Sequence, residues 1–67
     1  MVTVVIHYST SKDPDVYFGI TESTERRILR DLRDKWDITR APAEDWYGQD
    51  IKGYPVHHWN AQKKQAR

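Results

Sequence analysis

Three histidines are the residues best suited to metal chemistry in this chain of 67 residues. His57 and His58 are adjacent in a stretch with the pattern of a strand, so their side chains should point to opposite faces of a sheet and not to one metal ion. His7 and one of these two could meet across paired strands, but a typical site would still need a third ligand, and the chain has no cysteine. We therefore expect ordinary, partly exposed histidines, no metal site and no cofactor.

Serine, threonine and glycine show no catalytic or phosphate-binding arrangement. The Ser and Thr residues fall in turns and helix caps, where hydrogen bonds to the backbone account for them. Of the three glycines, none belongs to a glycine-rich loop that leads into a helix. The sequence thus favours a protein that is not an enzyme, and we assign no catalytic residues.

Aromatic residues give a stronger signal, because so short a chain has more of them than a thin core can enclose. Exposed Tyr and Trp beside Arg are typical of protein interfaces, and also of surfaces on which unpaired bases stack. The aromatic candidates for a binding surface are Tyr17, Trp46, Tyr47, Tyr54 and Trp59. Arg26 and Arg30 would add positive charge to this surface.

Most arginines of the central stretch have an acidic residue four positions ahead, as expected for ion pairs on a helix surface. The expected pairs are Arg27–Asp31, Arg30–Asp34 and Arg33–Asp37. Arg26 differs, because the residue four positions ahead of it is another arginine.

Residues 17–21 (YFGIT), followed by 25–28 (ERRI), resemble the second half of the GIY-YIG nuclease signature. That family has a strand ending in Tyr-x-Gly and then a helix with an arginine eight residues after the glycine, the position of Arg27. Residues 6–8 (IHY) stand where the first triplet of the signature should be. The resemblance extends over residues 2–59 but is specific only over 17–28. It implies that Tyr8 and Tyr17 lie beside the scissile phosphate and that Arg27 holds it.

The chain departs from this family at two positions that matter for cleavage. Ile6 replaces the glycine of the first triplet, and no acidic residue follows Asp50, although the family's metal-binding glutamate lies on a later helix. Cleavage by that mechanism needs a metal ion to stabilise charge on the phosphate. The resemblance therefore implies a truncated, inactive ββα core that binds nucleic acid, and an active magnesium-dependent nuclease is the least favoured alternative.

The elements that position these residues are organised around residues 16–36. Alternating apolar residues predict strands over 2–8 and 16–20, which the turn-rich residues 9–15 join into an antiparallel hairpin. Thr21 or Ser23 caps a helix that should run from about Glu22 to Trp36 or Asp37. The residues expected to pack together are Ile28, Leu29, Leu32 and Trp36 from the helix, and Val4, Ile6, Phe18 and Ile20 from the strands.

The remainder of the chain predicts one more strand. Residues 38–50 have no clear period, whereas residues 55–59 alternate, and Pro55 should either place that strand at a sheet edge or limit the pairing at its start. Residues 60–67 contain no large apolar side chain and carry only positive charges. We expect a single α+β domain at 1–59, with about three antiparallel strands against one amphipathic helix (ββαβ), and a basic, disordered tail at 60–67.

Charge and length restrict the function further. The formal net charge is only +1, which argues against a strong general attraction to nucleic acid. The apolar run 2–6 is too short for a signal peptide or a membrane span, so we expect a cytoplasmic protein without a membrane partner. We predict a small regulator, adaptor or inhibitor, of the type carried by phages and mobile elements, which binds a protein partner. A degenerate GIY-YIG-like domain that binds nucleic acid is the alternative, and homodimerisation is compatible with either.

Overall fold

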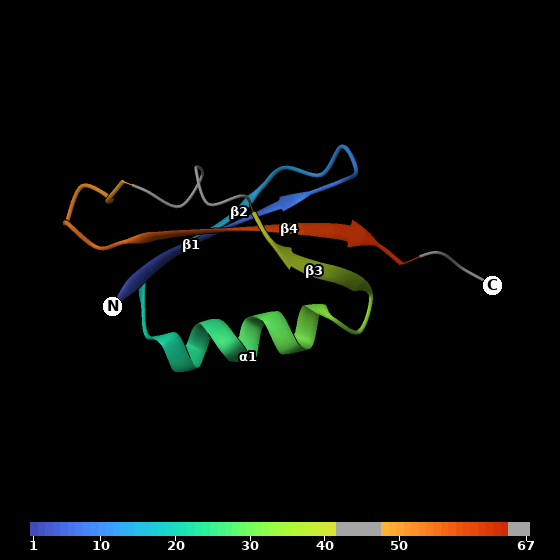
Figure 1. Ribbon diagram of the computed structural model, residues 1–67, viewed down its shortest axis with the longest axis horizontal. Coiled ribbons are helices and arrows are strands. Elements are labelled where there is room, and N and C mark those ends of the chain that lie inside the picture. Colours follow the sequence, from blue (N-terminus) through green and yellow to red (C-terminus); the bar gives the residue numbers. More distant parts are fainter. Residues whose placement is uncertain (42–47, 65–67) are drawn as a thin grey trace.

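The computed structural model describes residues 1–41 and 48–64. Trp46, Tyr47 and the end of the predicted tail, 65–67, lie outside the described residues. The described chain forms four strands and one helix (Figure 1). In chain order these are β1 (Val2–Tyr8), β2 (Asp15–Ile20), α1 (Glu22–Leu32), β3 (Trp36–Arg40) and β4 (Val56–Lys63).

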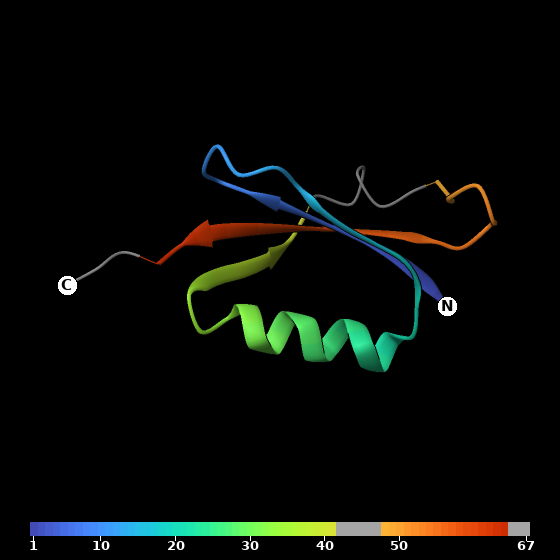
Figure 2. The same ribbon diagram turned by 180° about the vertical axis from the view of Figure 1, so that it is seen from behind.

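The strands form one mixed sheet in the order β2-β1-β4-β3. β1 pairs with β2, and β3 with β4, in antiparallel fashion, while β1 and β4 are parallel in the centre. Figures 1 and 2 show α1 lying along one face of this sheet. The α+β class with one helix against a sheet is as predicted, but the sheet has four strands instead of about three, and it is mixed rather than antiparallel. The helix carries the chain back along the sheet, so β3 runs in the same direction as β2 and the chain reverses once more into β4.

The helix begins where its cap predicts and ends earlier than expected. The Thr21 hydroxyl accepts a hydrogen bond from the Thr24 backbone N–H at 3.1 Å, and two acidic residues occupy the first turn. The helix ends at Leu32, and Trp36 is the first residue of β3 instead of the last residue of the apolar helix stripe. The reason is strand pairing: Trp36 lies opposite Lys63 of β4, and its ring packs edge-on against Tyr8 with centroids 4.8 Å apart.

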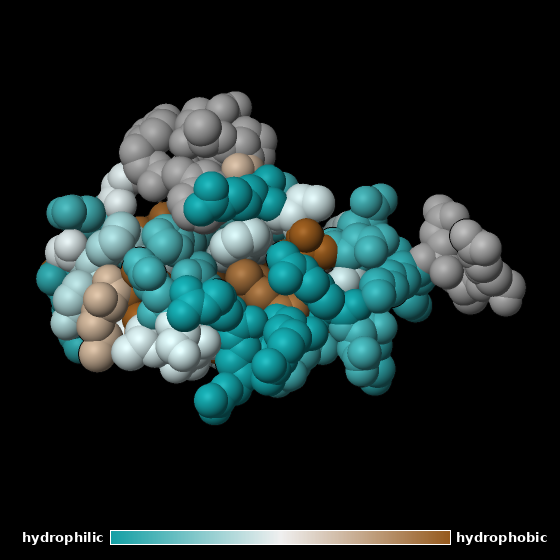
Figure 3. All heavy atoms as spheres, turned by 60° about the horizontal axis from the view of Figure 1, so that its bottom comes forward, coloured by the Kyte–Doolittle hydropathy of each residue, from teal (hydrophilic) through white to brown (hydrophobic). Residues whose placement is uncertain are grey.

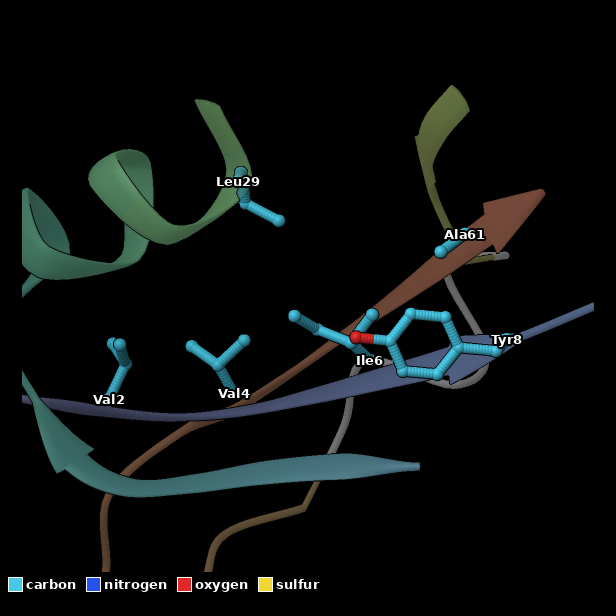
Figure 4. Packing of buried hydrophobic residues seen from close by; sticks show 6 residues of the cluster. All are labelled: Val2, Val4, Ile6, Tyr8, Leu29 and Ala61. Carbon is cyan, nitrogen blue, oxygen red and sulfur yellow. The ribbon is translucent and has the colours of Figure 1, made fainter. Parts of the chain in front are cut away.

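The core lies between β1 and α1. Alternate residues of β1 face the helix and are buried together with one helix residue and one residue of β4 (Figure 4). This buried cluster consists of Val2, Val4, Ile6, Tyr8, Leu29 and Ala61. Ile20, Ile28 and Leu32 pack against it from the side and are only partly buried.

A bulge in β2 reverses the predicted faces of the first part of this strand and leaves Ile20 on the predicted face. Val2 pairs with Ile20 and Val4 pairs with Tyr17, so β2 has one residue more than β1 over this span. Gly19 allows the bulge because it adopts a positive φ of 59°. Tyr17 and Ile20 therefore both face the core, whereas Phe18, predicted to be inside, is 68% exposed on the opposite face.

β4 is longer and more central than the sequence suggests. It continues to Lys63, so residues 60–63 belong to the sheet and not to a disordered tail. Pro55 precedes the strand, where its missing N–H removes no bond of the ladder, and its carbonyl accepts from the Thr3 backbone N–H at 2.9 Å. Of the two effects expected of Pro55, the edge position is wrong because β4 lies inside the sheet, whereas the strand does begin only after Pro55, at Val56. Within the described residues, no helix has the length and apolar character needed to cross a membrane.

Candidate binding site

A polar cluster joins α1 to β4 beneath the helix. Glu25, in the first turn, is only 6% exposed. Its carboxylate accepts hydrogen bonds from His57 Nδ1 at 3.0 Å and from Trp59 Nε1 at 2.9 Å. His57 and Trp59 are two residues apart on β4 and therefore face the helix together. These bonds satisfy a buried carboxylate that would otherwise be costly, and they fix the orientation of the Trp59 indole.

The Trp59 indole forms one wall of a shallow pocket between α1 and the sheet. The pocket has a volume of about 330 Å³ and is lined by Glu25, Arg26, Leu29, Arg30, Arg33 and Trp59; we call it the Trp59 pocket. Leu29 and Trp59 provide apolar surface, while the arginines of α1 are exposed around it. Arg40 of β3 adds a fourth guanidinium, 5.8 Å from the centre of the Trp59 ring.

A second hollow lies on the outer surface of α1. It has a volume of about 400 Å³ and is lined by Ser23, Arg26, Arg27 and Arg30, with no acidic residue among them. Arg26 and Arg30 thus border both hollows. Figure 3 shows that hydrophilic side chains predominate over this side of the molecule, with small hydrophobic areas between them.

The predicted ion pairs along the helix are not formed. In residues 1–41 and 48–64, the ion pairs within 4.0 Å join Lys12 to Asp15 and His57 to Glu25. None joins Arg27, Arg30 or Arg33 to the acid four residues ahead. The guanidinium groups of these three arginines therefore lie at the two hollows without a carboxylate partner in the described part of the chain.

The structure brings together three of the predicted binding residues, Arg26, Arg30 and Trp59. Arg27 lines only the hollow on the outer surface of α1. Tyr54 lies elsewhere, with its ring against Gly19 in β2.

Tyr17 packs against the core and does not line the Trp59 pocket. Burial, and to a lesser degree the nearby charge of Asp15, raises the pKa of the Tyr17 phenol.

Sequence reasoning missed the other members of the pocket. Arg33 could have been found, because positions 26, 30 and 33 lie along one side of a helix at spacings of four and three. Glu25 was interpretable only as an acid near the positive end of the helix dipole. Its role as a buried acceptor depends on the register of β4, which no local pattern specifies.

The residues of the nuclease-like motif occupy different environments. Tyr8 is buried in the core, and its hydroxyl donates a hydrogen bond to the Asp15 carboxylate. Burial and this bond raise the pKa of the Tyr8 phenol far above its ordinary value. Arg27 is exposed on the outer surface of α1. Within the described residues, no group of three or more His, Cys, Asp or Glu is placed to hold a metal ion.

Comparison with known proteins identifies no relative: no family model matches the chain, and neither a curated protein nor a solved structure matches it. The function must therefore be inferred from the geometry of the described residues.

Proposed function

We propose that this protein is a small non-enzymatic interaction protein that binds an acidic partner protein through the Trp59 pocket. The observation that carries the proposal is the environment of Trp59. Its indole is held by a hydrogen bond to the buried Glu25 and is surrounded by arginines. Tryptophan and arginine are enriched among the residues that dominate binding energy at protein interfaces. An indole that is already fixed in position loses little side-chain entropy on binding.

The chemistry of the pocket defines the partner. Trp59 offers apolar surface for one inserted side chain, with the nearly buried Leu29 beneath it, and a volume of about 330 Å³ suits a single side chain rather than a long segment. Arg26, Arg30 and Arg33 stand around this surface, where carboxylates of the partner can form paired hydrogen bonds with guanidinium groups. The expected partner surface is an apolar residue flanked by Asp or Glu.

Two arginines of α1 give a matched test of this proposal. Arg33 lines only the Trp59 pocket, and Arg27 lines only the outer hollow. Replacing each by glutamine removes one positive charge and keeps a long polar side chain. We expect Arg33→Gln to weaken capture of the partner at least about fivefold, a loss of roughly 1 kcal/mol, and Arg27→Gln to leave it within twofold.

The experiment is capture from a nuclease-treated lysate of the organism that encodes the protein, followed by affinity measurement with the purified partner. Wild-type protein and both variants are immobilised at equal density, and their fold is checked by circular dichroism. If both variants bind the partner as tightly as the wild type does, the partner does not bind at the Trp59 pocket, and the proposal is contradicted.

A second candidate function is nucleic-acid binding at the outer hollow. The supporting observation is that Ser23, Arg26, Arg27 and Arg30 line this hollow without an acidic residue, which suits a phosphate backbone. The resemblance of residues 17–28 to a nuclease motif that contains Arg27 agrees with it. In this case nuclease treatment abolishes capture, and Arg27→Gln, not Arg33→Gln, weakens binding.

A further inference from the structure

Two histidines meet on the face of the sheet opposite α1. In the parallel pairing of β1 with β4, Val5 lies opposite His58, and His7 lies opposite Asn60. His7 and His58 are therefore diagonal neighbours on one face, while His57 faces the helix and contacts Glu25. Of the two histidines that the sequence offers as partners for His7, the register selects His58.

The two imidazole rings lie edge to edge. His7 Nε2 and His58 Nδ1 are 3.0 Å apart, the ring planes differ by only 7°, and the centroids are 5.3 Å apart. Because a ring N–H lies in the plane of its ring, this arrangement is an N–H···N hydrogen bond in which one neutral imidazole accepts through its lone pair. Neutral imidazole nitrogen is also a common metal ligand, so a metal ion can replace the shared proton once the two lone pairs turn toward one point beside the line between the nitrogens.

The number and type of the ligands select the type of metal. Zinc sites in proteins use three or four protein ligands, and within the described residues no group of three or more His, Cys, Asp or Glu is placed to hold a metal ion. Nitrogen ligands in tetragonal geometry favour Cu²⁺ or Ni²⁺, and Cu²⁺ binds most tightly in the divalent series.

The surroundings leave room for such an ion and its remaining ligands. His7 is exposed, so its ring can turn to direct Nε2 away from His58 and toward a bound ion. Beside it lies a hollow of about 320 Å³ lined by His7, Tyr8, Ser9, Thr39, Asn60, Ala61 and Gln62. The hollow has no charged side chain in its lining, and its hydroxyl and amide oxygens can hold water molecules on the ion.

We propose that His7 and His58 together bind one Cu²⁺ ion, with water in the remaining positions. This site is independent of the proposed binding function, because it lies on the other face of the sheet and shares no residue with the Trp59 pocket. Its two ligands come from the two central strands of the sheet, so strand pairing rather than a loop holds their backbones side by side.

The test is titration of the full chain with Cu²⁺ in a weakly coordinating buffer, followed by electron paramagnetic resonance. We expect one tightly bound Cu²⁺ per chain, with hyperfine structure from two nitrogen ligands. His7→Ala and His58→Ala should each weaken binding at least about tenfold and leave at most one nitrogen ligand, since even outer-shell changes cost 10–100-fold at metal sites. Circular dichroism checks that these variants fold.

His57 provides the matched control, because it is the sequence neighbour of His58 but lies on the other face of the sheet. His57→Gln keeps a side-chain N–H that can donate to Glu25, and it should bind Cu²⁺ within twofold of the wild type. Weakening in His58→Ala and His57→Gln with unchanged binding in His7→Ala would assign the ion to the adjacent pair His57 and His58 and would overturn the proposal, and so would equal weakening in all three variants. Unchanged binding in His7→Ala, or a spectrum with one nitrogen ligand in the wild type, would overturn it as well.

Discussion

At the scale of single residues, Asp50 shows how one carboxylate holds the segment before β4. Its Oδ1 accepts from the backbone N–H groups of Lys52 at 2.8 Å and Tyr54 at 3.0 Å, and its Oδ2 accepts from the Thr3 hydroxyl. These bonds, that of Thr3 first, lower the pKa of the Asp50 carboxyl. The ionised carboxylate therefore ties the segment 50–54 to the first strand.

The lowered pKa predicts how stability depends on acid. A carboxyl whose pKa is lower in the folded state contributes stability above its unfolded pKa, near 3.9, and this contribution disappears as the pH falls through the folded value. We expect Asp50→Asn to be less stable than the wild type at pH 7 and to lose less stability between about pH 4 and pH 2. Urea unfolding at several pH values measures both, with Asp13→Asn, at an exposed turn position, as the control. Parallel acid profiles of Asp50→Asn and the wild type would contradict the prediction.

The raised pKa of Tyr8 predicts that stability decreases at alkaline pH. Burial and the hydrogen bond to Asp15 raise the pKa of its phenol, so the folded protein keeps a proton that the unfolded chain releases near pH 10. Stability should therefore fall as the pH rises above about 10. In Tyr8→Phe this loss should be smaller, and the part that remains should come from Tyr17, whose pKa is also raised. Urea unfolding between pH 8 and 11 measures the difference, and an unchanged alkaline slope in Tyr8→Phe would refute it.

At the scale of elements, α1 contributes one residue to the buried cluster. Leu29 is 4% exposed, whereas Ile28 and Leu32 are only partly buried. Leu29→Ala should cost about 2–4 kcal/mol, against a total stability on the order of 3–5 kcal/mol for a chain of this size. We expect Leu29→Ala to be largely unfolded at 25 °C and Leu32→Ala to remain folded with a smaller loss, as measured by circular dichroism and urea unfolding.

A conservative replacement separates packing from helix formation. Leu29→Met keeps the volume and the helix propensity and should lose less than about 1.5 kcal/mol. An Ala variant at position 29 that is as stable as the one at position 32 would show that the core does not depend on this residue of the helix.

Local patterns predict the elements whose signals act within a few residues. The alternation in β1, the Thr21 cap and the start of α1 all follow from the sequence. β3 was not predicted, because Trp36 continues the helix stripe at a spacing of four and also begins the alternating run WDITR. Pairing with β4 decides between these two patterns, and that pairing involves residues far away in the sequence.

The same limit applies to the candidate sites. Aromatic and arginine residues in excess of a small core indicated Arg26, Arg30 and Trp59, which the structure brings together. The bulge at Gly19 and the register of β4 are tertiary features, and they decide that Tyr17 faces inward and that His58 meets His7. Sequence alone could name these residue types but not their partners.

At the scale of the whole molecule, the two faces of the sheet differ in chemistry. The face that α1 covers carries arginines around an indole, and the opposite face carries the histidine pair and the exposed side chains of Val16 and Phe18. The formal net charge is only +1, because acidic residues elsewhere balance the arginines. The excess of positive charge is therefore confined to the surface near the arginines. A partner approaching from a distance therefore meets little overall attraction, and one close to the arginines meets a strong one.

This distribution predicts how binding of the protein partner responds to salt. The arginines around the Trp59 pocket act over a short range, about 10 Å in 0.1 M salt, so they should mainly accelerate association. Raising the salt concentration from 50 to 200 mM should lower the association rate constant several-fold and leave the dissociation rate constant within about twofold. The reason is that the apolar contact at Trp59 and Leu29 is not screened by ions. Surface plasmon resonance with the captured partner measures both constants. If dissociation accelerates more than association slows, the complex is held by ionic contacts, and the indole is not its centre.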